Sequence, residues 1–138
     1  MQRDLPENDR YITCMQDSLK ERAIAFYRTA YAGDPRLAVE RYVGDRYVQH
    51  NPVVSDGKEG FIAYFERMQR EYPDKSISFL RAVEEENLVA LHTLQVWPGN
   101  ERYVTMDFFR FDDHGKIVEH WDAIQRVPDE MAHDNGMR

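Results

Sequence analysis

The chain has 138 residues and a formal net charge of −7, which is the size of one domain with a substantial core. Its acidic balance, without a Lys/Arg run, argues against a binder of nucleic acid or of an anionic membrane surface. The single cysteine, Cys14, cannot form an intramolecular disulfide or a cysteine zinc cluster, which favours a cytoplasmic location. Segment 1–10 is not typical of a signal peptide. The sequence has no run of about 18 apolar residues, so no membrane span is predicted.

Helical spacing of apolar residues predicts three helices in the first half of the chain. Asp17 or Ser18 caps the first, and the Gly-Asp-Pro run at 33–35 ends it and opens a short second helix. Segment 47–52 is expected to be irregular, because its Asn-Pro step disfavours helix. A third helix is expected between residues 55 and 73.

From residue 74 the pattern changes to short runs rich in Val, Ile, Phe and Tyr, separated by Gly, Asn and Pro. The predicted strands are 76–83, 88–97, 103–111 and 117–125. Helices followed by an antiparallel sheet indicate an α+β fold. We expect the helices to cover the concave side of a curved sheet and to form a cone-like barrel around a pocket for a small ligand. The prediction is a single domain over 1–138, with a core at about 17–128 and loose tails at both ends.

Three neighbouring strands of this predicted sheet each place ionisable residues among apolar ones. By alternation, His92 shares a face with leucines and alanine, Asp107 with aromatic residues, and His120 and Asp122 with valine and isoleucine. Three such cases on adjacent strands indicate a polar patch inside an apolar cavity. A hairpin register with Asp107 opposite His120 gathers these groups and is preferred to one with Asp107 opposite Trp121.

Asp107 is the first candidate for a catalytic acid/base, because a carboxylate in an apolar pocket beside a histidine can be tuned for proton transfer. His92, His120 and Asp122 could each orient it or polarise a substrate oxygen. Structural alternatives remain open: Asp107 can pair with Arg81 or Arg110, and the histidines can be satisfied core residues. The expected substrate-binding residues are His50, Asn51, His120, Trp121 and Asp122.

No metal and no cofactor are expected. Three histidines and two aspartates can converge in this fold, but no short-spaced ligand motif such as H-E-x-x-H is present. The chain also lacks a glycine-rich phosphate loop, so a nucleotide cofactor is not indicated.

Several short sequence segments are informative when they are considered together. They are YVQHNP at 47–52, the glycines around 57–60, His92, DFFRF at 107–111 and GKIVEHWD at 115–122. Together they resemble the SnoaL-like polyketide-cyclase family of the nuclear transport factor two-like superfamily, over roughly residues 17–128. The resemblance implies an α+β cone-like barrel with a deep hydrophobic pocket, often in a homodimer.

In the characterised cyclases of that family, a pocket aspartate acts as acid/base in an intramolecular aldol ring closure, without cofactor or metal, and a histidine lies nearby. His92 and Asp107 match that pair by their positions on successive strands. Asp122 resembles a pocket aspartate of the more distant limonene epoxide hydrolases. The superfamily also contains plain binding domains, and a fold does not determine a function.

The leading hypothesis is a cofactor-independent lyase or isomerase that acts on a small hydrophobic carbonyl compound. Asp107 would remove the proton α to the carbonyl, and His92 or His120 would steady the enolate oxygen. The first alternative is a non-catalytic ligand-binding or dimerising module. The second is an epoxide-hydrolase-like or dehydratase activity in which Asp122 activates water.

A homodimer is expected as well. By alternation, the outer face of the sheet carries Val104, Met106 and Phe108, an apolar row that a monomer would leave exposed to water.

Overall fold

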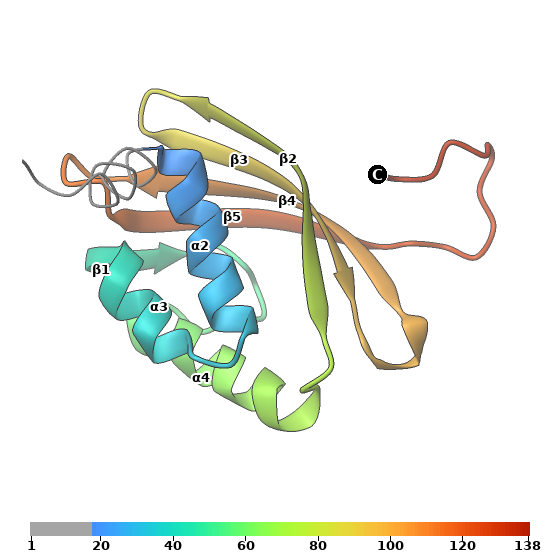
Figure 1. Ribbon diagram of the computed structural model, residues 1–138, viewed down its shortest axis with the longest axis horizontal. Helices are drawn as coiled ribbons and strands as arrows, with labels where there is room; N and C mark the ends of the chain where they lie inside the picture. Colours follow the sequence, from blue (N-terminus) through green and yellow to red (C-terminus); the bar gives the residue numbers. More distant parts are fainter. Residues whose placement is uncertain (1–17) are drawn as a thin grey trace, which may run out of the picture.

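The computed structural model describes residues 18–138, in which three helices pack on a five-stranded sheet (Figure 1). The expected N-terminal tail and Asp17, one of the two candidate caps, lie outside the described residues. Within the described part, no helix is long and apolar enough to cross a membrane. The elements are α2 (Leu19–Tyr31), α3 (Pro35–Tyr42), β1 (Val43–Gln49), α4 (Gly57–Glu71), β2 (Ser76–Glu85), β3 (Leu88–Val96), the 3₁₀ turn η1 (Pro98–Asn100), β4 (Arg102–Phe111) and β5 (Ile117–Arg126).

The helices begin at side chains that accept hydrogen bonds from otherwise free backbone N–H groups. Ser18 accepts from the N–H of Glu21 at the start of α2, and Asp34 accepts from the N–H of Leu37 at the start of α3. Asp56 caps α4 in the same way. The three predicted helices are thus confirmed, and together with the sheet they confirm the α+β fold class.

The sheet order is β1-β5-β4-β3-β2, and only the β1–β5 pair is parallel. The prediction that segment 47–52 is irregular is wrong for residues 47–49, because they belong to β1. Its middle is exposed and polar, as at Asp45 and Arg46, so it shows no strand pattern. β1 forms because it hydrogen-bonds to the edge of β5, which lies about seventy positions further along the chain.

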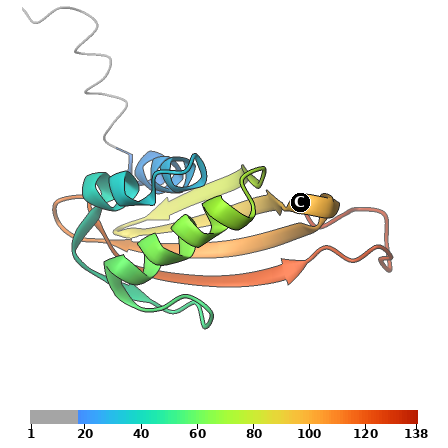
Figure 2. The same cartoon turned by 90° about the horizontal axis from the view of Figure 1, so that it is seen from below.

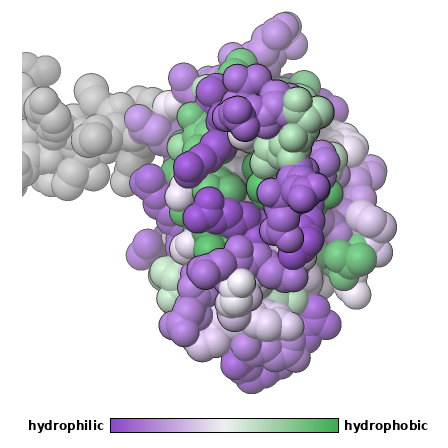
Figure 3. Space-filling model, turned by 90° about the vertical axis from the view of Figure 1, so that its right-hand side faces the viewer, coloured by the Kyte–Doolittle hydropathy of each residue, from purple (hydrophilic) through white to green (hydrophobic). Residues whose placement is uncertain are grey.

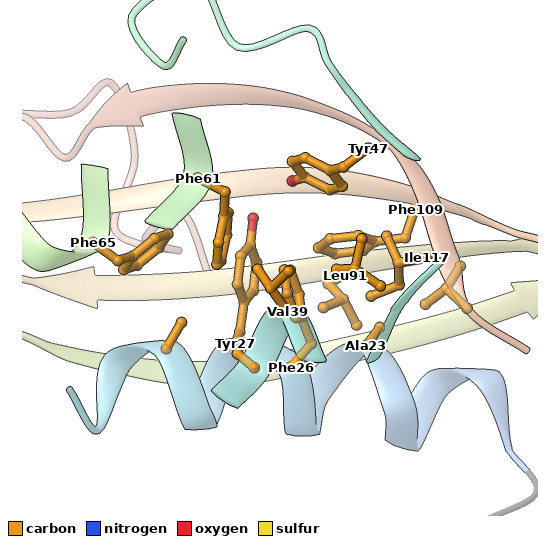
Figure 4. Packing of buried hydrophobic residues seen from close by; sticks show 14 of the residues in the cluster. Ala23, Phe26, Tyr27, Val39, Tyr47, Phe61, Phe65, Leu91, Phe109 and Ile117 are labelled. Carbon is orange, nitrogen blue, oxygen red and sulfur yellow. The ribbon is translucent and has the colours of Figure 1, made fainter. Parts of the chain in front are cut away.

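The core lies between the helices and one face of the sheet (Figures 2 and 4). Phe26 of α2 stacks on Phe61 of α4, with ring centroids 4.6 Å apart, and contacts Phe109 of β4 edge-on at 6.0 Å. Burial of each ring stabilises the fold by about 1.5–3 kcal/mol. This aromatic cluster therefore holds two helices against the middle of the sheet.

The hairpin between β4 and β5 has neither of the two expected registers. The loop is the three-residue one that ends at Gly115, where φ is +70°, and this loop alone would place Asp107 opposite Trp121. A bulge then leaves Val118 without a partner of its own, because Arg110 pairs with Glu119 and Phe111 pairs with Ile117. The extra residue moves Asp122 opposite Asp107 and so restores both carboxylates to one face.

Gly60 lies in the first turns of α4, where the loop that carries Asn51 passes close to the helix. A Cβ atom at Gly60 would overlap the carbonyl group of Ser55. This neighbour is backbone, so the overlap is relieved only if the loop or the helix moves. We expect Gly60→Ala to lower the free energy of unfolding by about 1–3 kcal/mol, measured by urea denaturation. Glu66→Ala, at an exposed position of the same helix, is the control, and equal losses in both variants would contradict the prediction.

Candidate active site

A small inner cavity of about 40 Å³ lies where α2, α4, β1 and β5 meet. It has room for one functional group of a ligand, on the scale of one or two water molecules. Four tyrosines and five other polar side chains contribute to its wall. The tyrosines are Tyr27, Tyr31, Tyr47 and Tyr64, and the other polar side chains are Gln49, Asn51, Gln95, His120 and Asp122.

Asp122 is the carboxylate that faces this cavity. Its side chain is 8% exposed, and both of its oxygens accept from the Nδ2 of Asn51, at 2.9 and 3.0 Å. The orientation of the Asn51 amide is set because its Oδ1 accepts from the N–H of Val53 at 2.9 Å. Burial raises the pKa of Asp122, although His120 and the Asn51 hydrogen bond act in the opposite direction. A raised pKa favours a carboxylate as a proton acceptor near neutral pH.

Asp107 lies behind this wall and is 1% exposed. Its Oδ1 accepts from the hydroxyl of Tyr27 at 2.5 Å and lies 2.8 Å from Nε2 of His120. Its Oδ2 accepts from the hydroxyl of Thr105 at 2.5 Å, and Thr105 in turn contacts Thr93. Asp107 does not line the cavity, so its three partners, rather than a ligand, occupy its oxygens.

His120 links the buried aspartate to the cavity. Its Nε2 lies 2.8 Å from Asp107 and 3.9 Å from Oδ2 of Asp122, and its Nδ1 lies 2.7 Å from Oε1 of Gln49. The hydroxyl of Tyr27 also lies 2.9 Å from Nε2. The ring is thus held from both sides while it forms part of the cavity wall.

The tyrosine hydroxyls of the cavity are neutral hydrogen-bond donors. Burial raises the pKa of Tyr27, Tyr31 and Tyr47 well above the usual range, and nearby carboxylates add to the effect. The Nε2 of Gln49 donates to the hydroxyl of Tyr47 at 3.4 Å, which leaves the proton of that hydroxyl for a cavity ligand. Figure 4 shows Tyr27 and Tyr47 close together beside Phe61.

The expected position of His92 in the pocket is wrong. The inward residues of β3 are Val89, Leu91 and Thr93, whereas His92 lies on the outer face. There its Nδ1 lies 3.0 Å from Arg81, and its Nε2 lies 3.2 Å from the backbone carbonyl of Met137. Both faces of β3 carry apolar residues, so alternation could not decide which one faces the helices.

His50 and Trp121 also lie outside the cavity wall. Their rings stack with centroids 4.9 Å apart, and Nε2 of His50 lies 2.8 Å from Glu119. Arg110, the expected alternative partner of Asp107, instead binds Glu119 at 3.0 Å and covers the ring of Trp121. Of the expected ligand-binding residues, the structure therefore brings Asn51, His120 and Asp122 to the cavity.

Tyr27, Gln49 and Thr105 are site residues that the sequence patterns do not predict. Tyr27 belongs to the apolar stripe of α2 and resembles a core residue, while Thr105 has the strand propensity of its neighbours. Gln49 does lie within the 47–52 string, which was the one available signal.

Among the described residues, Asp107, His120 and Asp122 form a group whose ligand atoms lie within 4.8 Å of one another. They are the residues that could hold a divalent cation. Each already has hydrogen-bond partners, and no buried side-chain nitrogen or oxygen of the described chain lacks one. A cation would have to displace Tyr27 and part the Asp107–His120 pair, so the donor set fits a hydrogen-bonded network better than a metal site.

A wider outer pocket of about 280 Å³ lies beside the inner cavity. The two share Tyr64, Gln95 and Ile124 as wall residues. The outer pocket is mainly apolar and has four aromatic side chains, of which Tyr72 and Trp97 meet edge-on with ring centroids 5.6 Å apart. On the end of the molecule drawn in Figure 3, hydrophobic areas remain visible between hydrophilic residues.

Comparison with known proteins places this geometry in a family. The model of the SnoaL-like domain matches residues 23–120, well over half of the chain. A comparison with the curated proteins gave no match.

Solved structures with the same fold come from several streptomycetes. TsrD from Streptomyces laurentii has a TM-score of 0.65 at 22% identity, over 79% of this chain and 90% of that chain. IdmH from Streptomyces antibioticus, provisionally assigned as a polyketide cyclase, has a TM-score of 0.65 at 18% identity, over 78% and 91%. AclR from Streptomyces galilaeus, provisionally assigned as a hydroxylase, has a TM-score of 0.56 at 25% identity, over 78% and 91%. With its α+β architecture and the extent of the family match, this chain belongs to the SnoaL-like domain family.

Proposed function

We propose that the protein is a cofactor-independent lyase or isomerase that transfers protons on a hydrophobic carbonyl compound, with Asp122 as the base. The observation that carries this proposal is a cavity-facing carboxylate with a raised pKa, oriented by Asn51. Asp107, the candidate favoured by the sequence, is given a supporting role because it lies behind Tyr27 and His120. The provisional assignment of IdmH as a polyketide cyclase supports this class of chemistry.

In the proposed reaction, a carboxylate oxygen of Asp122 takes the proton α to the carbonyl, and the C–H electron pair moves into an enolate. A donor in the cavity wall stabilises the enolate oxygen, and the hydroxyl of Tyr47 is in place to do so, whereas both ring nitrogens of His120 are already engaged by Gln49 and Asp107. Asp122 then returns the proton to carbon in an isomerisation. In an aldol reaction, the enolate carbon attacks a second carbonyl of the substrate, and the proton goes to the new alkoxide.

The shape of the two pockets favours a ligand with one reactive end. The inner cavity admits a carbonyl group, and the mainly apolar outer pocket accommodates an apolar body. The cavity wall within the described residues carries no arginine or lysine, which makes the epoxide-hydrolase-like alternative less favourable, because that reaction needs a strong donor beside the leaving oxygen.

The test is α-proton exchange, which does not require the natural substrate. The wild-type protein is incubated in D₂O with a panel of aryl ketones and β-diketones, and deuterium at the α-carbon is followed by NMR. We expect saturable exchange above the buffer rate for at least one compound that carries an apolar body. The second candidate, a binding module without turnover, is favoured by the complete hydrogen bonding of the site. Saturable binding of these ketones without any exchange would replace the enzyme proposal with it.

We also propose that a second copy of the chain covers the outer face of the sheet. Met106 and Phe108 are 50% and 46% exposed there, whereas Val104, expected in the same row, is buried within one chain. The tail after β5 turns back toward the sheet (Figure 1) and contacts His92 through Met137. The tail does not cover the side chains of Met106 and Phe108, which remain exposed.

Sedimentation at micromolar concentration is expected to give a dimer, and Phe108→Lys is expected to shift it to monomer, because a buried unpaired charge is costly. Ala63→Lys is the control, since Ala63 is an exposed residue of α4, which packs on the opposite face of the sheet. A wild-type monomer would contradict the prediction.

A further inference from the structure

We infer that Gln49 is a positioning residue that holds a proton on Nδ1 of His120 and thereby keeps a second, shared proton between His120 and Asp107. The inference deepens the proposed function, on which its catalytic consequence rests.

First, the orientation of the Gln49 amide is determined by the backbone. Its Oε1 accepts from the N–H of His50 and from the N–H of Asn51, both at 3.1 Å. A reversed amide would point its NH₂ group at two N–H donors, which cannot accept. Its own N–H donates to Oδ1 of Asp56 at 2.9 Å, which ties the end of β1 to the cap of α4.

Second, the carbonyl of Gln49 determines which nitrogen of His120 is protonated. Nδ1 of His120 lies 2.7 Å from Oε1 of Gln49. An amide oxygen offers only lone pairs, so Nδ1 must carry the hydrogen. The neutral form of His120 therefore has a bare Nε2.

Third, a bare Nε2 cannot lie 2.8 Å from a bare carboxylate oxygen of Asp107. The hydroxyl of Tyr27 donates to that same oxygen at 2.5 Å, and Thr105 donates to the other. The hydroxyl of Tyr27 also lies 2.9 Å from Nε2 but has only one proton, so the His120–Asp107 pair must carry one more, either as imidazolium and carboxylate or as neutral imidazole and carboxylic acid. Both forms give the pair a total charge of zero.

The consequence concerns Asp122, the proposed base, whose Oδ2 lies 3.9 Å from Nε2. Without the carbonyl of Gln49, the single proton of a neutral His120 could move to Nε2 and donate to an ionised Asp107. The pair would then carry a charge of −1 next to Asp122 and would oppose its ionisation. Gln49 thus keeps a neutral pair beside the base and a fixed ring in the cavity wall.

The test is the ¹⁵N NMR spectrum of the histidine rings, in which two-bond couplings distinguish the two tautomers and the imidazolium form. The signals of His120 are assigned by their loss in His120→Gln. We expect Nδ1 of His120 to be protonated in the wild-type protein and in Gln49→Glu, whose carboxylate still accepts. We expect the hydrogen to move to Nε2 in Gln49→Leu, with α-proton exchange falling about a hundredfold and KM unchanged.

The spectrum decides the inference whether or not any ketone exchanges its protons. A wild-type Nδ1 without hydrogen overturns it, even if Gln49→Leu fails to fold. An unchanged tautomer in a folded Gln49→Leu overturns it as well, and any loss of exchange would then reflect packing. A protonated Nδ1 that is lost only in the leucine variant supports the inference, and absence of exchange in the wild-type protein would then count against the proposed function alone.

Discussion

Asp122→Asn is expected to lower the rate of α-proton exchange by about a thousandfold, the scale of a lost general base. Asparagine keeps the shape of the side chain and can still accept from Asn51, so the cavity should persist. The measurement is deuterium incorporation into whichever ketone the wild-type protein exchanges. Exchange within threefold of wild type would remove Asp122 from the role of base.

The same variant is expected to be more stable than the wild-type protein at neutral pH. Burial raises the pKa of Asp122 above its ordinary value of 3.8, so the folded protein holds this proton more tightly than the unfolded chain. The stability from this group is fully present below pH 3.8 and is lost as the pH rises through the folded pKa. At pH 7 the buried charge lowers stability, and asparagine removes it. The midpoint of thermal unfolding should therefore rise at pH 7, with little change near pH 3.5.

Asp56→Asn is the matched control with the opposite sign. Asp56 is exposed, and backbone hydrogen bonds from Gln49 and Gly57 lower its pKa. Its contribution to stability is present above the unfolded pKa and is lost as the pH falls through the folded pKa. Its asparagine variant should therefore be less stable than wild type at pH 7. Shifts of the same sign in both variants would show that burial does not govern Asp122.

Asp107→Ala is expected to have the largest effect on stability, a loss of about 3–5 kcal/mol in the free energy of unfolding. The change leaves the hydroxyls of Tyr27 and Thr105 and the ring of His120 without their acceptor in a site that is almost completely buried. Urea denaturation at pH 7 measures the loss.

Two further variants test the origin of this loss. Asp107→Asn keeps an acceptor for Tyr27 and should lose much less stability than the alanine variant. Asp45→Ala, at an exposed position of β1, should change the free energy of unfolding by less than about 0.5 kcal/mol. A loss in Asp107→Ala no larger than that of Asp45→Ala would show that water replaces the carboxylate at no cost.

The sequence by itself determined the class and most elements of the fold, because these depend on local signals. Caps at Ser18, Asp34 and Asp56 define where helices begin, and runs of β-branched and aromatic residues define four of the five strands. Alternation also placed Asp107 on the face of β4 that points to the core.

Only the tertiary structure decided how the site is built. The bulge at Val118 shifts the pairing of β4 with β5 by one residue. No local sequence pattern predicts such an extra residue in a strand. Both faces of β3 carry apolar residues, so the sequence could not predict that His92 points outward. Tyr27 reaches Asp107 from a helix eighty residues away, and Gln49 reaches His120 through a parallel pairing at the sheet edge. The geometry of the site depends on contacts between distant segments, and the sequence specifies these only through the packing of the whole chain.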